Sequence, residues 1–162
     1  MHETFEVVIT AIVSRGNKYL IMRRSATKRR FPGMWTVPGG HLETKDFIGT
    51  PKETKEYWYN VLEKALRREV REEAGIEIKD IEYVTSLATI HKDGAPSLVV
   101  SCLARYDSGD ITLQLEETDR AEWVSLREAK NYKLIDGIYD ELVMADSVRR
   151  GRRTEWARST SL

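Results

Sequence analysis

The stretch Arg68-Glu69-Val70-Arg71-Glu72-Glu73-Ala74-Gly75-Ile76 combines a helical repeat with a dense group of acids. It ends the segment Tyr57–Ala74, in which apolar residues recur at four-residue steps. Such a stripe predicts a helix with one face packed on a sheet. Gly75 follows directly and is typical of a helix C-terminus. The apolar stripe consists of Trp58, Leu62, Leu66, Val70 and Ala74.

Three glutamates of this stretch lie beside the apolar stripe. At about 100° per residue, Glu69 and Glu73 fall on the flank of Leu62 and Leu66, with Glu72 next to Glu69. Charged runs usually mark a solvated face. Here, however, carboxylates on a partly buried face repel each other and are costly to desolvate. A divalent cation relieves both penalties, and Mg²⁺ or Mn²⁺ prefers oxygen ligands, so we predict a metal site at this end of the helix.

The remaining elements predict an α/β fold. Gly16-Asn17 and Asp93-Gly94 indicate turns, the latter in a hairpin, and a second helix is expected over 137–148. Strands, helix, strands and helix in this order predict a central mixed sheet with helices packed on it, an α/β/α sandwich. The expected strands are Phe5–Val13, Tyr19–Met22, Trp35–Val37, Ile81–Ile90, Ser97–Tyr106, Ile111–Leu115 and Glu122–Leu126.

Length and composition predict a single domain over 1–148, followed by a basic tail over 149–162 that we interpret as a solvated terminus. Lys plus Arg and Asp plus Glu both number 26, so net charge gives no reason to expect a nucleic-acid or membrane partner. The N-terminus lacks the pattern of a signal peptide, and Cys102 is the one cysteine. We therefore expect a cytoplasmic protein without disulfides.

The acidic stretch also resembles a known family signature. Residues 68–76 match the second half of the Nudix box, which reads Arg-Glu, an aliphatic, any residue, Glu-Glu, any residue, Gly, an aliphatic. Upstream, Pro38-Gly39-Gly40-His41-Leu42-Glu43 is similar to the Gly-Gly-x-x-Glu stretch that opens the box, and Trp123–Ala129 resembles the family's late strand-to-helix passage. The resemblance implies the Nudix fold, the α/β/α sandwich with a central mixed sheet.

The first half of the box departs from the family pattern. The box usually has a Glu six residues after its opening glycine and eight before its Arg. Counting from Gly40 reaches Asp46, whereas counting back from Arg68 reaches Asn60. The two counts disagree, so Asp46–Tyr59 contains an insertion. This leaves the role of the first Glu unassigned.

The resemblance implies hydrolysis of a phosphoanhydride by a metal-activated water, with Mg²⁺ as cofactor and Mn²⁺ as a possible substitute. The implied metal ligands are Glu69, Glu72 and Glu73, with the carbonyl of Gly39. Arg68 is expected to orient the glutamates. In the family the general base comes either from the box helix or from a later loop.

In this chain the loop candidate is Glu117, which is also a candidate metal ligand and is equally well interpreted as part of a polar turn. Arg24 and Glu43 are candidates for contacting phosphate, sugar or base, and both are equally consistent with surface charges. Asp136 is a candidate near the base pocket, or a helix cap.

Several interpretations stay open on sequence alone. The substrate is either a nucleoside diphosphate-linked compound or a (deoxy)nucleoside triphosphate, since specificity lies in variable loops. A non-catalytic Nudix-fold module that binds nucleotide is the alternative to an enzyme. Retention of Glu69, Glu72 and Glu73 favours the enzyme. The expected partner is a small nucleotide, and the protein is expected to be a monomer or a homodimer.

Overall fold

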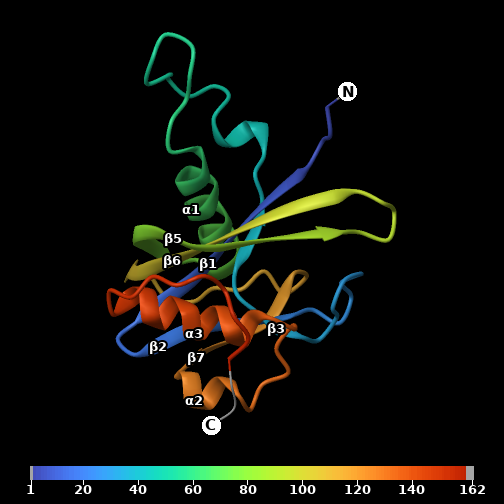
Figure 1. Cartoon of the computed structure of the whole chain (residues 1–162), viewed down its shortest axis with the longest axis vertical. Coiled ribbons are helices and arrows are strands. Elements are labelled where there is room, and N and C mark those ends of the chain that lie inside the picture. The colour runs from blue at the N-terminus through green and yellow to red at the C-terminus, as the bar shows by residue number, and fades with distance from the viewer. Residues whose placement is uncertain (1, 160–162) are drawn as a thin grey trace.

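A seven-stranded mixed sheet forms the centre of residues 2–159, the part of the chain that the computed structural model describes (Figure 1). The strand order is β3-β2-β1-β6-β5, with β4 pairing to β1 and β7 to β2. Only the β1–β6 pair is parallel among these pairings. The strands are β1 Glu6–Arg15, β2 Lys18–Arg24, β3 Trp35–Thr36, β4 Gly39–His41, β5 Glu77–Ile90, β6 Pro96–Ser108 and β7 Thr118–Val124.

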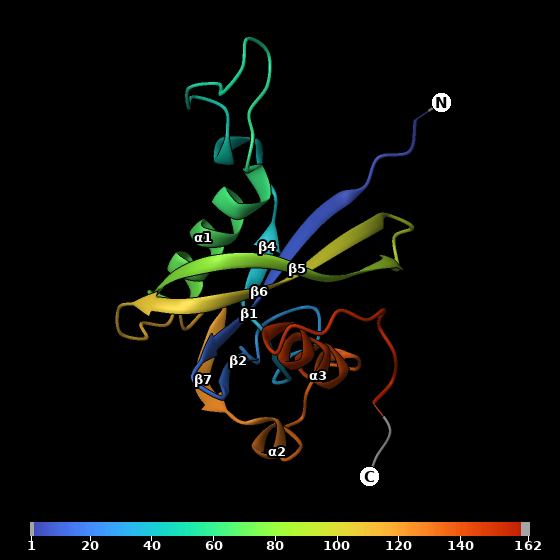
Figure 2. The ribbon, with the colours of Figure 1, turned by 60° about the vertical axis from the view of Figure 1, so that its left-hand side comes forward.

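Helices cover both faces of this sheet, as Figure 2 shows. The helices are α1 Val61–Ala74, α2 Leu126–Ala129 and α3 Ile138–Arg149, together with the short 3-10 helix η1 Thr44–Asp46. Residues alternate along β1: Ile9, Ala11 and Val13 pack with the α1 side of the core, whereas Ile12 packs with the α3 side. A strand buried on both faces explains the near-continuous apolar run in the sequence. The predicted α/β/α sandwich with a mixed sheet is confirmed.

The helix that carries the acidic stretch is shorter than predicted. It begins at Val61, because Asn60 has a left-handed φ of 55° and ends the preceding loop. The predicted helical start at Tyr57 was therefore wrong, whereas the predicted stop is confirmed by the left-handed Gly75, whose N–H bonds the carbonyl of Arg71. No helix within residues 2–159 has the length and apolarity needed to span a membrane.

The segment 111–115 is irregular, so the predicted strand there was wrong. The N–H of Thr112 donates to the carbonyl of Ala74 at 2.9 Å, and the carbonyl of Gln114 accepts from Glu117 and Thr118. Its backbone groups therefore form hydrogen bonds with the end of α1 and within a turn, and not with a neighbouring strand. The apolar pattern of this segment does indicate burial, since Ile111 and Leu113 pack against the core.

The insertion projects as a self-contained loop between η1 and α1 (Figures 1 and 2). The rings of Phe47 and Trp58 pack at 5.3 Å between centroids, and the Trp58 indole N–H donates to the carbonyl of Thr50 at 2.9 Å. Glu53 accepts from the N–H of Tyr59 at 3.0 Å. These local bonds give the loop its shape without extending the helix.

Residues 149–158 of the C-terminal tail are exposed, and a few of the tail's groups bond the domain as far as Ser159. Its interpretation as a solvated terminus stays a prediction. The buried carboxylate of Asp140 accepts from the Arg158 guanidinium at 2.9 Å. It also accepts from both the N–H and the hydroxyl of Ser159 at 2.6 Å. Arg153 donates to the carbonyl of Tyr83 at 2.8 Å. The tail therefore neutralises an acid that would otherwise be buried unpaired.

We expect Arg158→Ala to lower the free energy of unfolding slightly, because Asp140 loses a charged partner that is itself exposed to solvent. Arg152→Ala is the control, since its side chain forms no hydrogen bond or ion pair with any residue of 2–159. Urea unfolding of both variants measures the difference. Equal stability of the two variants would show that the tail contributes nothing to the fold.

Candidate functional site

The C-terminal half of α1 lies against the glycine pair of β4. A methyl group added at Gly40 would meet the Glu69 carboxyl carbon at 2.3 Å, and one at Gly39 would meet the Ile9 carbonyl at 2.5 Å. Gly39 therefore excludes any side chain, because the backbone of β1 is in the way, whereas a side chain at Gly40 would displace the Glu69 carboxylate. The glycines allow the main chain of β4 and the carboxylate of Glu69 to approach each other closely.

Arg68 holds the acidic residues of the helix in place. Its guanidinium donates to Glu69 at 2.8 Å, to Glu72 at 3.1 Å and to the carbonyl of His41 at 3.0 Å. It also forms a two-point ion pair with the buried carboxylate of Asp46. The hydrogen bond that Arg68 donates to Asp46 is the largest cause that raises the pKa of Arg68. The predicted positioning role of Arg68 agrees with this geometry.

Asp46 is the site residue that the sequence left without a role. Burial alone would raise the pKa of Asp46, but hydrogen bonds from Arg68 and from the backbone of Glu43 lower it overall. Asp46 is thus a charged partner of Arg68. The count of six residues from Gly40 was the signal for it, and the insertion lies after this position, over 47–60.

The two glutamates nearest the glycine pair carry unfavourable charge. Burial is the largest cause that raises the pKa of Glu73, to about 8, followed by the nearby charge of Glu69. A backbone hydrogen bond from Gly39 lowers it in part. Burial also raises the pKa of Glu69, although Arg68 opposes that shift. Two oxygen donors that repel each other at the edge of a buried face fit a hard divalent cation.

Glu72 differs from the other two glutamates, because its side chain is exposed and rests on Arg68. Within residues 2–159, no three His, Cys, Asp or Glu side chains are already arranged to hold a metal ion. The donor pair of Glu69 and Glu73 is therefore in place, while a third carboxylate would have to turn toward it.

Arg24 and Glu117 approach this group from other elements. Arg24 ends β2, and Glu117 precedes β7, where its carbonyl accepts from the N–H of Ser25 at 3.0 Å. The charge of Glu117 contributes to the raised pKa of Glu73, while Arg24 opposes it. Burial lowers the pKa of Arg24, and Glu73 and Glu117 partly restore it. The carboxylate of Glu117 is paired with Lys28 of the basic loop, a contact that the sequence did not reveal.

The two remaining candidates, Glu43 and Asp136, lie in different parts of the fold. Glu43 caps η1 next to Asp46 and pairs with Lys45 at 3.0 Å; its charge adds to the raised pKa of Glu69. Asp136 precedes α3, on the opposite face of the sheet from α1, and pairs with Arg158 at 2.8 Å. The cap of α3 is Gly137, so Asp136 is not a helix cap. Its contact with a base stays a prediction.

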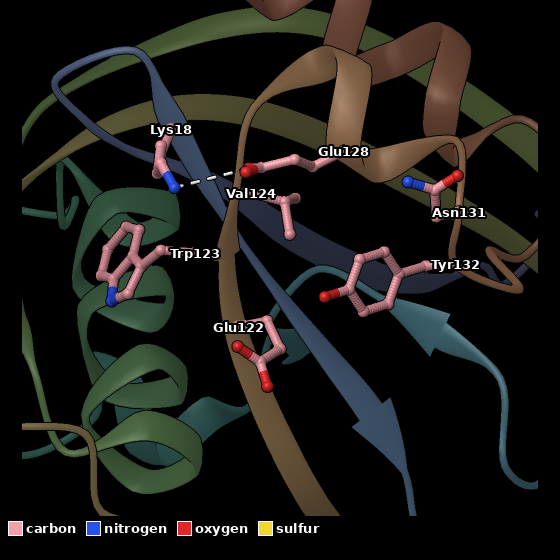
Figure 3. Close-up of a pocket in the computed structure, with 7 residues that line it drawn as sticks. All are labelled: Lys18, Glu122, Trp123, Val124, Glu128, Asn131 and Tyr132. Carbon is pink, nitrogen blue, oxygen red and sulfur yellow. Dashed lines mark ion pairs between the residues drawn. The ribbon is translucent and has the colours of Figure 1, made fainter.

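A separate hollow lies between the end of β7 and α2 (Figure 3). Trp123, Tyr132 and Glu128 line it, and Glu128 pairs with Lys18 at 3.5 Å. None of the candidate metal ligands lines this hollow. The cluster of Glu69, Glu73 and Glu117, near the other end of β7, is therefore the stronger candidate for the catalytic site.

Comparison with known proteins agrees with this arrangement. The profile of the NUDIX domain matches residues 4–144. The chain belongs to the NUDIX family. Its fold is shared with the MutT NUDIX hydrolase of Burkholderia pseudomallei, at a TM-score of 0.69 and 21% identity over 88% of this chain and 98% of that one. An ADP-ribose pyrophosphatase of Streptococcus suis has the same fold, at a TM-score of 0.66 and 20% identity over 94% and 98% of the two chains.

The relatives found by sequence are longer proteins than this NUDIX chain. The NAD-capped RNA hydrolase NudC of Haemophilus influenzae (strain PittEE) is 31% identical over 127 residues, which are 76% of this chain and 42% of the relative. The chain thus spans about two fifths of the length of such relatives. The rest of the relative has no counterpart in the aligned part of this chain.

We expect Asp46→Ala to weaken Mn²⁺ binding by about 10-fold to 100-fold, because Arg68 would lose the partner that fixes its direction toward Glu69 and Glu72. Asp46→Glu should recover part of the affinity. Isothermal titration calorimetry measures both variants. Unchanged affinity in Asp46→Ala would mean that Arg68 is positioned without this carboxylate.

We also expect Glu73→Gln to stabilise the metal-free protein. The folded pKa of Glu73, about 8, is raised above the ordinary value of 4.5. Its contribution to stability is therefore full at acid pH and is lost as pH rises toward 8. The melting temperature of Glu73→Gln should exceed that of the wild type at pH 8, by roughly 4–8 °C for a gain near 2 kcal/mol.

The same comparison at pH 4 to 5 should show little difference between Glu73→Gln and the wild type. Glu72→Gln is the control, since that side chain is exposed. Melting is followed in EDTA at both pH values. A Glu73→Gln protein that is less stable than the wild type at pH 8 would contradict the buried, repelled carboxylate.

Proposed function

We propose that this NUDIX protein is a divalent-metal-dependent hydrolase of phosphoanhydride bonds in nucleoside diphosphate-linked compounds. The observation that carries the proposal is the pair of mutually repelling carboxylates, Glu69, which is buried, and Glu73, which is partly buried, beside Gly39 and Gly40. A fold gains nothing in stability from such a pair. A bound cation would explain why the chain has this pair of carboxylates, and we propose Mg²⁺, with Mn²⁺ as a substitute.

Glu69, Glu72, Glu73 and the carbonyl of Gly39 would hold the cation. When bound, it supplies positive charge for the diphosphate and lowers the pKa of an attacking water. The protein groups supply the orientation. Arg68 bonds both Glu69 and the exposed Glu72, and Glu72 would have to turn from Arg68 toward the other ligands to bind the cation. The Glu69 carboxylate lies against Gly40, and a backbone hydrogen bond from Gly39 reaches Glu73, which keeps both acids beside β4.

Glu117 is our candidate for the general base. It lies near enough to Glu73 and Arg24 to influence the pKa of both, so its carboxylate borders the place where a water would be activated. Lys28 and Arg24 provide positive charge on the same side, which suits the phosphate groups of a substrate. The water oxygen would form a bond to phosphorus as its proton passes to Glu117, and the bond from phosphorus to the bridging oxygen would break, releasing the other phosphate as the leaving group.

The substrate class follows from the sequence relatives. A relative that is 31% identical over 76% of this chain is an NAD-capped RNA hydrolase, and NAD contains a diphosphate between two nucleosides. We therefore place dinucleotide-type diphosphates ahead of nucleoside triphosphates. Because the chain spans only 42% of that relative, an RNA-linked substrate is not carried over.

Hydrolysis of NAD, ADP-ribose and nucleoside triphosphates with Mg²⁺ or Mn²⁺ tests the proposal, with products identified by chromatography. We expect two nucleoside monophosphates from NAD, and loss of ~100-fold or more of the rate in Glu69→Gln and Glu72→Gln. Both variants should keep the wild-type circular dichroism spectrum.

Glu63→Gln is the matched control, since Glu63 lies on the same helix outside the site. Equal product release by the wild type and the two variants would reject the metal site. Tight nucleotide binding without turnover by the wild type would favour a non-catalytic NUDIX module.

A further inference from the structure

The loop between β2 and β3 presents an aromatic ring next to a group of cations. It contains the run Lys28-Arg29-Arg30-Phe31, and the Phe31 side chain is 52% exposed. Phe31 belongs to neither half of the hydrophobic core, and its ring packs on no other aromatic ring of residues 2–159. An exposed ring alone is common on protein surfaces, so its backbone and its neighbours decide what it does.

The backbone holds Phe31 in a costly conformation. Its φ is 50°, although Phe31 is a bulky residue that precedes a proline. Residues 31–34 form a tight turn, in which the N–H of Met34 donates to the Phe31 carbonyl at 3.3 Å and Gly33 has a φ of 71°. Strained backbone of this kind is concentrated at sites that contact ligands. The turn thus fixes an exposed ring that the core does not use.

This turn is anchored to the proposed cation site through Arg24. The N–H of Gly33 donates to the Arg24 carbonyl at 3.0 Å, and Nε of Arg24 donates to the carbonyl of Arg30 at 2.7 Å. The charge of Arg24 in turn opposes the raised pKa of Glu73. Phe31 therefore follows directly on a residue that is bonded to the edge of the site.

The loop carries more positive charge than the acids around it balance. Lys28 is paired with Glu117, the candidate general base. Arg29 and Arg30 are exposed, and neither forms an ion pair with a carboxylate of residues 2–159. The Arg30 guanidinium lies 3.2 Å from Nε2 of His91, just beyond the end of β5, which limits the directions in which it can point. Two guanidinium groups are thus left for an anion beside the site.

We propose that the run 28–31 binds a nucleotide unit of the substrate that carries a further phosphate, beyond the diphosphate that is cleaved. The base of that unit stacks on Phe31, and the further phosphate accepts hydrogen bonds from Arg29 and Arg30. This inference rests on the proposed function, because the diphosphate must occupy the cation site. The further phosphate is either a monoester on the ribose or the diester of an attached nucleotide, since both place anionic oxygens next to a base.

The combination of groups favours this ligand over others that a basic loop can bind. A guanidinium forms parallel hydrogen bonds with two phosphate oxygens, and an aromatic ring stacks on any base. An anionic membrane surface would need several apolar side chains to insert, but Phe31 is the one large apolar side chain that is exposed among residues 24–34. The loop is also continuous with the proposed cation site, so the group that reaches it is the rest of the substrate.

Hydrolysis of three substrates with Mg²⁺ tests the inference: NAD, NADP, which has an additional ribose phosphate, and NAD extended at its adenosine 3′ oxygen by one nucleotide. We expect kcat/KM to be about 10-fold or more higher for one of the two phosphate-bearing substrates than for NAD, as one charge-assisted contact implies. A preference for NADP identifies the monoester, and a preference for the extended substrate identifies the diester. The preference should shrink as ionic strength rises.

Equal kcat/KM for the three substrates would overturn this inference and leave the proposed function standing. Hydrolysis of none of them would overturn the proposed function and this inference with it. Calorimetric titration in EDTA gives a measurement without turnover: adenosine 2′,5′-bisphosphate or its 3′,5′ isomer should bind more tightly than adenosine monophosphate.

Variants locate the further phosphate and the base. Arg29→Ala and Arg30→Ala should each reduce the ratio of kcat/KM for the preferred substrate to that for NAD, whereas Phe31→Ala should weaken binding of the bisphosphate. Arg127→Ala is the matched control for charge, since Arg127 is exposed on α2. Tyr57→Ala is the control for the ring, since Tyr57 is 62% exposed on the insertion. A preference that survives when Arg29 and Arg30 are both replaced would overturn the inference.

Discussion

The ion pair between Arg68 and Asp46 connects the parts of the site. It joins α1 to the segment that follows β4, across an insertion that would otherwise separate the two halves of the box. With one side of its guanidinium fixed by Asp46, Arg68 directs its remaining N–H groups to Glu69, Glu72 and the His41 carbonyl. The planar guanidinium forms several hydrogen bonds in fixed directions, so it holds its partners in a defined geometry, which the flexible ammonium group of a lysine would not do. The insertion can therefore vary in length and shape while the carboxylates keep their place.

The carboxylate pair itself works against folding. Glu69 and Glu73 both have a raised pKa, chiefly because they are buried, and their charges add to one another. The surrounding fold compensates elsewhere, with a core on each face of the sheet and a tail that neutralises Asp140. Stability and function thus make opposite demands on the end of one helix, as is common where charge is gathered for catalysis. The glycine pair adds to this arrangement by giving the acids a polar main-chain neighbour without a side chain.

The sequence predicted the sandwich, the core stripe of α1 and its stop at Gly75, because periodicity and a left-handed glycine act locally. It failed where distant parts of the chain compete for the same groups. Residues 111–115 have the hydrophobicity of a strand but bond the end of α1, and the contact of Arg158 with Asp140 joins residues that no local pattern relates. Asp46 was unassigned because the insertion disrupted the spacing, and its contact with Arg68 exists only in three dimensions. The link between Glu117 and Lys28 likewise joins two loops that no local pattern relates.

The account depends most on one claim, that Glu69 and Glu73 are a cation site. Calorimetric titration of Mn²⁺ into the protein at pH 7, in two buffers of different ionisation enthalpy, tests it most directly. Because the pKa of Glu73 is about 8, this carboxyl is largely protonated at pH 7 and must lose its proton to bind a cation. We predict binding with release of about one proton, falling toward zero above pH 9. Binding without proton release at pH 7, or no binding at all, would contradict the claim.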